Sequence, residues 1–427
     1  MKRKTFSSLS HARQRGSLGK PLGLIFLLAV LFILAATQAH GQELDGKRFT
    51  LRGFGTIGAT TQDADGLEFR RNVGQAHGVG SGDVALTADS LAGVQMDVRL
   101  GAGFDVLAQG VTRLRADGDW SPQVTQAFVR YSPDESLVLR VGRVGYDIYL
   151  LAESRQVGYS YLALRPSLEF YGFITNDRID GGDISYSHRL GGALVRARLF
   201  GGGGSGELAF ADETNAGTTG TVYGASIDYI FRAWTARAAY VSFDYDGNAG
   251  FEQLAAGLRM TGVPEAIRIA DDIEHDVFNS EGLQLGVAYE DGPLQAQVLF
   301  GTVTSKSLTG PDVDKFYSLV GYRMQQWMPF LSFASSRDRN SYVASGLPDI
   351  PVFAPFEGAI RLIQKNSRST QHSVSFGVRF DFASHFDLKL QVDRIALRDS
   401  SLMFDRRVPP GGDADMTVIA AALDFVF

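Results

Sequence analysis

Residues 373–382 read Ser-Val-Ser-Phe-Gly-Val-Arg-Phe-Asp-Phe, so small or polar side chains alternate with large apolar ones. Successive side chains of a β-strand point to opposite faces, and this period of two therefore predicts a strand with one apolar and one polar face. The same alternation recurs in residues 92–100, 283–290 and 388–393. Each such strand is suited to separate an apolar environment from a polar one.

Sixteen segments of this kind follow one another along the chain. They are residues 47–61, 83–100, 104–117, 122–132, 136–144, 181–190, 193–203, 219–231, 233–245, 280–291, 294–308, 312–325, 327–339, 370–382, 386–400 and 414–427. Each even-numbered segment is followed by a turn of a few residues, whereas most odd-numbered segments are followed by a longer connection. The longer connections are residues 62–82, 145–180, 204–218, 246–279, 340–369 and 401–413. This pattern predicts an all-β fold, a closed 16-stranded antiparallel transmembrane barrel with short periplasmic turns and long extracellular loops.

A soluble β-sandwich or propeller is the alternative interpretation of the same alternation. A propeller needs a blade repeat of about 40 residues, and none is visible. Aromatic residues such as Tyr229, Trp234, Tyr322 and Trp327 flank the short turns, where a barrel would meet lipid headgroups. These features favour the membrane barrel.

The first forty residues have the composition of a removable leader. Residues 1–21 carry six basic residues and no acid, residues 22–36 are apolar, and small residues follow at 39–41. This order predicts a cleaved signal peptide over residues 1–41 and a single exported barrel domain over residues 42–427, with an uncleaved N-terminal anchor as the alternative. The remaining chain has 35 basic and 47 acidic residues, so we expect no nucleic-acid partner.

Composition and motifs give no support for an enzyme or a cofactor-binding protein. The chain has no Cys, which excludes disulfides, thiolate nucleophiles and iron–sulfur clusters. Residues 53–58 match G-x-G-x-x-G, but the strand pattern continues where a nucleotide-binding helix would begin. Residues 201–206 lack the Lys-Ser/Thr of a phosphate loop, and we expect a flexible loop tip there. A Ser and His pair could indicate an outer-membrane hydrolase. His372 and Ser373, however, are adjacent on a strand and point to opposite faces, so they cannot share a proton directly.

An acidic cluster lies in one of the long connections. It consists of Asp271, Asp272, Glu274, His275 and Asp276. Its oxygens could bind Ca²⁺, but the spacing matches no EF-hand, and a solvated loop is the preferred interpretation. Short helical patterns at residues 254–260 and 356–364 are expected to stay within the long loops, with the alternative that one of them tucks into the mouth of the barrel.

The last predicted strand carries a family resemblance. Residues 419–427 read Ile-Ala-Ala-Ala-Leu-Asp-Phe-Val-Phe, with apolar side chains on one face. Together with the leader and sixteen strands, this resembles the trimeric porins of Gram-negative outer membranes, over the whole architecture rather than in any one motif. The resemblance implies a homotrimer in outer-membrane lipid and lipopolysaccharide. It also implies that the barrel-assembly machinery reads Phe427 and that the last strand pairs with the strand beginning near Lys47.

A barrel of sixteen strands is wide enough to hold an aqueous lumen, because barrel diameter grows with strand number. The expected function is therefore passive diffusion of small hydrophilic solutes and ions, without chemistry. In the porin family the third long loop folds into the lumen and narrows it. Its counterpart here, residues 145–180, would supply the constriction residues Tyr146, Asp147, Glu153, Arg155, Arg165, Glu169 and Asp177.

A row of arginines occupies the polar phase of the first five strands. These are Arg52, Arg99, Arg113, Arg130 and Arg140. Facing a loop with carboxylates, they would set a transverse field that selects charged solutes. We therefore expect that replacing Arg99, Arg130 and Arg140 together shifts selectivity toward cations. The alternatives are that these charges only solvate a wet wall, or that the lumen is plugged and the long loops serve adhesion or receptor binding.

Overall fold

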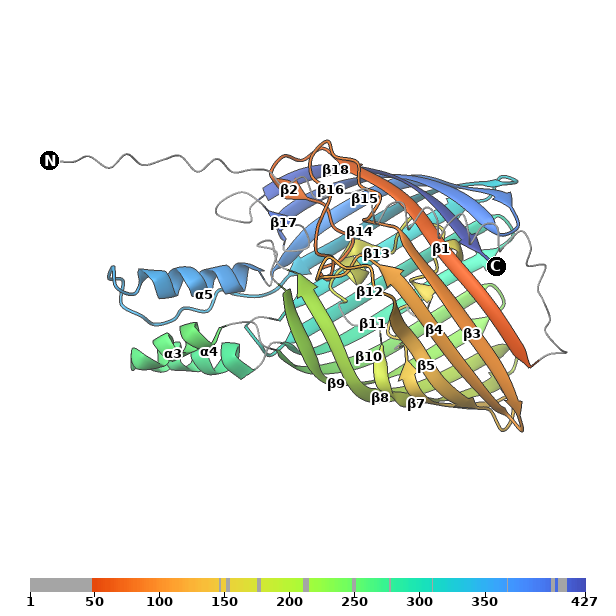
Figure 1. Cartoon of the computed structure of the whole chain (residues 1–427), viewed down its shortest axis with the longest axis horizontal. Coiled ribbons are helices and arrows are strands. Elements are labelled where there is room, and N and C mark those ends of the chain that lie inside the picture. The colour runs from red at the N-terminus through yellow and green to blue at the C-terminus, as the bar shows by residue number, and fades with distance from the viewer. Residues whose placement is uncertain are drawn as a thin grey trace, which may run out of the picture.

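Sixteen β-strands close an antiparallel barrel in the computed structural model of the chain (Figure 1). The structure describes residues 48–145, 147–150, 154–174, 178–209, 215–247, 251–275, 278–308, 310–366, 368–400, 404–405 and 413–427. The barrel strands are β1 (Phe49–Gln62), β3 (Leu91–Gly101), β4 (Phe104–Arg113), β5 (Gln123–Tyr131), β6 (Leu137–Val144), β7 (Ile179–Leu190), β8 (Ala193–Ala209), β9 (Asn215–Phe231), β10 (Trp234–Gly247), β11 (Phe278–Asp291), β12 (Leu294–Ser305), β13 (Val313–Tyr322), β14 (Trp327–Asp338), β15 (Ser369–Ala383), β16 (Phe386–Ser400) and β18 (Asp413–Val426). The predicted fold class is confirmed.

The first and last strands close the ring. Strand β1 pairs with β3 on one side and with β18 on the other, with Gly55 opposite Phe425. The amide of Gly53 donates to the carbonyl of Phe427, and the amide of Phe427 donates back to Gly53, both at 2.9 Å. A Cβ at Gly53 would lie 2.0 Å from the Phe427 ring, so a side chain there would displace it. The expected pairing of the last strand with the strand beginning near Lys47 is therefore confirmed.

Most strand boundaries agree with the predicted segments within four residues, and two do not. Strand β3 begins at Leu91 rather than near residue 83. The other error concerns β8, which runs on to Ala209 through residues 201–206, where we expected a flexible loop tip. Glycines there let strands approach closely, since a Cβ on Gly181 of β7 would lie 2.2 Å from the carbonyl oxygen of Gly201.

The two faces of the strands have different exposure. Leu283 and Leu285 of β11 point outward and are exposed, whereas Gln284 between them is buried inside the barrel. The outward aromatics Trp234 and Trp327 lie beside short turns. Because the apolar side chains face out, the barrel is built to stand in an apolar medium.

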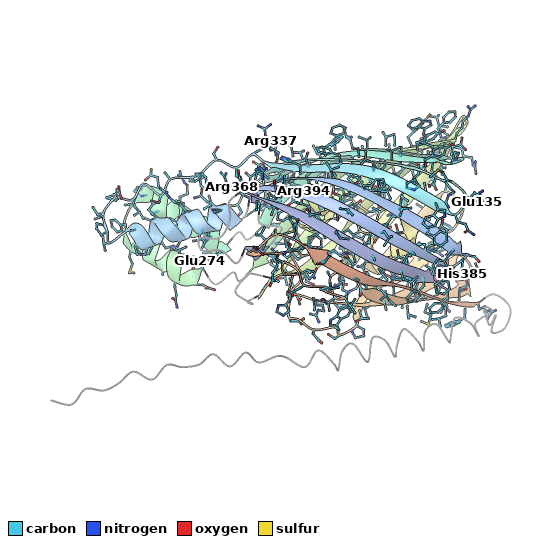
Figure 2. All side chains as sticks on the ribbon, turned by 90° about the horizontal axis from the view of Figure 1, so that it is seen from above. Glu135, Glu274, Arg337, Arg368, His385 and Arg394 are labelled. Atoms are coloured by element: carbon cyan, nitrogen blue, oxygen red, sulfur yellow. The ribbon has the colours of Figure 1, made fainter. Side chains whose placement is uncertain are left out.

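Three helices project from the end of the barrel that carries the long loops (Figures 1 and 2). They are α3 (Glu252–Met260), α4 (Pro264–His275) and α5 (Ala354–Asn366), so both expected helical patterns are confirmed. Their shared apolar core includes Leu258, Ile273 and Ile360. No helix in the described ranges has the length and apolar content needed to cross a membrane.

Most of the acidic cluster lies on α4 rather than in a loop, which corrects the sequence interpretation. Arg259 of α3 donates to Asp271 at 2.8 Å and also to Glu274, and these hydrogen bonds raise the pKa of Arg259. Asp272 accepts a hydrogen bond from the amide of Leu308 at 2.7 Å. Asp276 lies outside the described residues. Among the residues that are described, no group of three or more His, Cys, Asp or Glu side chains could hold a metal ion.

Candidate functional site

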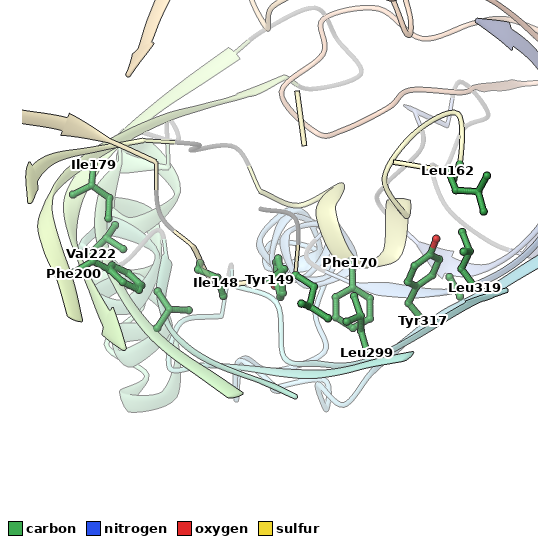
Figure 3. Close-up of a cluster of buried hydrophobic side chains, with 14 of the residues drawn as sticks. Ile148, Tyr149, Leu162, Phe170, Ile179, Phe200, Val222, Leu299, Tyr317 and Leu319 are labelled. Carbon is green, nitrogen blue, oxygen red and sulfur yellow. The ribbon is translucent and has the colours of Figure 1, made fainter. Parts of the chain in front are cut away.

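The third loop, between β6 and β7, lies inside the barrel and packs on its inner wall (Figure 3). Its short helix α2 (Leu168–Tyr171) places Phe170 against Leu299 of β12 and Tyr317 of β13. The rings of Tyr149 and Phe170 meet edge to face, with centroids 5.5 Å apart. The inner wall here is an apolar core, although we expected the inward phase of every strand to face water.

An ion-pair network fixes the beginning of the loop to the wall. One carboxylate oxygen of Asp147 accepts from Arg198 of β8 at 3.0 Å, and the other pairs with Arg237 of β10. Arg237 also contacts Asp228 of β9 at 2.6 Å. Asp147 is therefore compensated by two arginines of the wall.

The middle of the loop reaches the short-turn end of the barrel. A 3₁₀ turn, η2 (Gly158–Ser160), presents carbonyl groups to the wall, and Lys389 of β16 donates to the carbonyls of Gly158 and Tyr161, both at 2.7 Å. Tyr159 donates its hydroxyl to the carbonyl of Ser384, in the turn between β15 and β16, at 2.9 Å. The third loop thus extends through the depth of the barrel.

A second stretch, which we call the inward segment (residues 63–90, between β1 and β3), also folds against the inner wall. Its residues Phe69 and Val73 pack with Ile395 of β16 and Met416 of β18. The strand β2 (Leu67–Glu68) within it pairs with β17 (Phe404–Asp405). Sequence reasoning missed this segment, although the inward phases of β16 and β18 turn apolar toward their long-loop ends, at Ile395, Leu397, Met416 and Val418.

The inner wall of β3 to β7 carries its own carboxylates. Arg52 of β1 pairs with Asp97 of β3 at 3.1 Å, Arg130 with Asp105 of β4 at 2.8 Å, and Arg140 with Asp183 of β7 at 2.7 Å. The carboxylates that these three arginines contact here lie on neighbouring strands. The transverse field across a constriction stays a prediction.

The two remaining arginines of the row lie at opposite ends of the wall. Arg99 is exposed near the short-turn end, opposite Asp105, whose carboxylate already accepts two hydrogen bonds from Arg130. Arg113 lies at the long-loop end of β4, in register with Leu91. A pore-lining role for the row as a whole stays a prediction.

Several predicted constriction residues are anchors of the third loop. Arg165 and Glu169 are buried, and Glu169 accepts a hydrogen bond from Gln371 of β15 at 2.9 Å. The carbonyl of Arg155 accepts from the Tyr161 hydroxyl at 3.2 Å. Tyr146, Glu153 and Asp177 lie outside the described residues. Like Asp147, Arg165 and Glu169 face the wall or the inward segment, so the loop's charges hold it in place.

Solvent reaches the inner wall near the short-turn end of β1 to β5. The side chains of Arg52 and Arg130 are 59% and 42% exposed although both point into the barrel. Further along the same strands the wall is packed, because Phe54, Leu91 and Val111 cluster with Val157 of the third loop and Phe128 is buried.

The closed barrel with an inward-folded loop defines the structural class of the chain. No family model matches the sequence, and no protein of curated function matches it. OmpF of Salmonella typhi, solved in complex with daunomycin, superposes with a TM-score of 0.52 at 14% identity, over 90% of this chain and 98% of that one. At that identity the likeness shows a shared barrel fold.

Two further solved structures are similar over most of their length. An anion-selective porin from Comamonas acidovorans gives a TM-score of 0.49 at 14% identity, over 89% of this chain and 99% of that one. OmpT of Vibrio cholerae, expressed in the outer membrane, gives a TM-score of 0.48 at 10% identity, over 90% of this chain and 99% of that one.

Proposed function

We propose that this protein is an outer-membrane channel of the porin type, which passes small hydrophilic solutes and ions by diffusion and catalyses no reaction. The observation that carries the proposal is the solvent exposure of charged side chains on the inner wall, at Arg52, Arg99 and Arg130. An apolar outer face and a charged, wet inner face are what a transmembrane barrel with an aqueous passage requires.

The cellular setting is part of this proposal. The signal peptide over residues 1–41 follows from the composition of that stretch. The homotrimer and the contacts with outer-membrane lipid and lipopolysaccharide follow from the resemblance to porins. The apolar outer face supports a bilayer location. The closed sheet supports it too, because a sheet without free edges satisfies its backbone hydrogen bonds without water.

Planar-bilayer recording of the purified barrel tests the proposal. We expect discrete conductance steps after addition of the folded protein, because charged inward side chains at Arg52, Arg99 and Arg130 are accessible to water. The same preparation unfolded by heat is the control and should give none. A folded barrel that inserts into the bilayer and remains silent would contradict the proposal.

A plugged barrel is the second candidate function. It is favoured by the two stretches that fill one side of the interior and by helices α3, α4 and α5, which project as a surface for a binding partner. A silent barrel in the bilayer experiment would favour this candidate.

We propose a modest preference for anions. Arg99, Arg189 and Arg196 follow the inward phase near the short-turn end and make no ion pair with other described residues. The nearby acids Asp97, Asp105 and Asp228 already pair with Arg52, Arg130 and Arg237, and Glu290 shares the same phase and end. Arg99→Glu should lower the chloride-to-potassium permeability ratio by about twofold or more. Reversal potentials in a salt gradient measure the ratio. Arg394→Glu, on the outer face, is the matched control, and an equal shift in both variants would reject the assignment.

We propose that the barrel-assembly machinery recognises Phe427. Phe427→Ser keeps both backbone hydrogen bonds to Gly53 but removes the ring that covers it. We expect a several-fold loss of folded barrel in outer-membrane fractions, measured by heat-modifiable gel mobility. Phe427→Tyr keeps the ring and should assemble normally. Equal yields of the Ser variant and the unaltered chain would count against this role.

A further inference from the structure

Arg165 lies where the third loop, the inward segment and the barrel wall meet. Its side chain is only 2% exposed, and it sits in a stretch that neither lines the accessible wall nor faces solvent. A guanidinium buried this deeply is stable only when carboxylates compensate its charge.

Two carboxylates from different parts of the chain bind this guanidinium. Nε and Nη2 donate to the two oxygens of Asp89, in the inward segment, at 3.0 and 2.9 Å. Nη1 donates to Asp393 of β16 at 2.8 Å. The guanidinium also lies over the ring of Phe69, in the inward segment, with its carbon 4.8 Å from the ring centroid. The bidentate pair with Asp89 fixes both the distance and the orientation of the two stretches.

Neighbouring groups hold both carboxylates in position. Thr60 of β1 donates its hydroxyl to Asp89 at 2.6 Å, and Gln391 donates to Asp393 at 2.6 Å. The other end of the Gln391 amide accepts from the backbone amide of Leu164 at 2.8 Å. Side chains of the barrel wall therefore hold both carboxylates in place.

Two weaker contacts join the same stretches. The amide of Val73 in the inward segment donates to the carbonyl of Gly172 in the third loop at 2.9 Å. Arg71 of the inward segment reaches the hydroxyl of Tyr161 at 3.4 Å. Leu168 of the third loop also packs in one apolar cluster with Phe69 and Val73. None of these contacts has the charge complementarity and fixed geometry of the Arg165 site.

We propose that Arg165 is a positioning residue that locks the inward segment to the third loop, so that together they set the largest solute that passes the barrel. This inference rests on the proposed channel function. With the lock intact, the two stretches occupy one side of the interior as a single unit. Without it, only the weaker contacts between the two stretches remain, and the passage widens.

The test compares Arg165→Gln with Arg339→Gln in planar bilayers. Arg339 is a matched control, because it pairs with Asp312 and Asp314 at the long-loop rim, away from the interior packing. We expect Arg165→Gln to raise single-channel conductance by about twofold and to admit larger neutral polyethylene glycols. Arg165→Lys keeps the charge and should restore part of the wild-type size limit. Heat-modifiable gel mobility shows that each variant is folded.

Wild-type conductance and size limit in folded Arg165→Gln would overturn the lock. If that variant does not fold, Asp89→Asn decides, since it keeps the pair with Asp393: a wider size limit supports the lock, and a wild-type limit overturns it. A silent wild type that conducts after either substitution would refute the open channel yet support the lock. If wild type and both variants are all silent, both ideas fail.

Discussion

Leu285→Arg should lower the free energy of unfolding in lipid vesicles by about 2–4 kcal/mol, the cost of a cation on the lipid face of a barrel near the bilayer centre. Leu285 lies midway along β11, points outward and is 60% exposed. In a soluble protein an exposed position of this kind would tolerate Arg with little change. The size of the loss therefore reports whether this face meets hydrocarbon.

Denaturant titration of the folded barrel in vesicles measures this loss. Leu285→Phe is the matched control, since it keeps an apolar side chain at the same position and should change stability little. If Leu285→Arg were as stable as Leu285→Phe, the outward face of β11 would not be lipid-facing.

Phe170→Ala should release the third loop from the wall of β12 and β13. Phe170 is fully buried against Leu299 and Tyr317, and truncating a buried Phe typically removes about 3–5 kcal/mol of packing. Because this core holds the loop to one side, we expect noisier channels with frequent partial closures as the loop enters the free side of the passage. Single-channel recording measures the frequency of these closures.

Phe316→Ala is the control for the loss of a Phe ring. Phe316 is adjacent to Tyr317 on β13 but points to the outer face, where it packs near Phe300 and Phe333. It should leave the channel record unchanged. Quiet recordings from Phe170→Ala would mean that the ion pairs of Asp147 and Arg165 hold the loop without the apolar core.

The alternation in the sequence was sufficient to predict the number, order and closure of the barrel strands. It worked because a strand between lipid and water must change polarity at every residue. The prediction failed where residues have no side chain to alternate, and where an alternating segment does not belong to the barrel wall. The glycines of residues 201–204 have no side chains to show a period, and residues 83–90 alternate but belong to the inward segment, whose Ala85 forms only an isolated bridge with Thr60.

The candidate site was predictable only in outline. The residues of the third loop were identified, and the resemblance to porins correctly implied that the loop folds inward. Their partners could not be predicted, because a residue such as Asp393 reads as a polar, inward strand position whether it faces water or Arg165. The pairing of Arg52, Arg130 and Arg140 within the wall depends on strand register, which the sequence pattern does not fix to a single residue.

The third loop and the inward segment pack against most of the inner wall, and their apolar clusters include Phe54 of β1, Val111 of β4 and Phe128 of β5. Substitutions in this packed region disturb a core and threaten folding. Arg52 and Arg130 lie exposed near the short-turn end, so substitutions there change the charge at one mouth of the proposed channel and leave that core intact. Permeability and folding stability can therefore change independently of each other, through substitutions at the rim or in the packed interior.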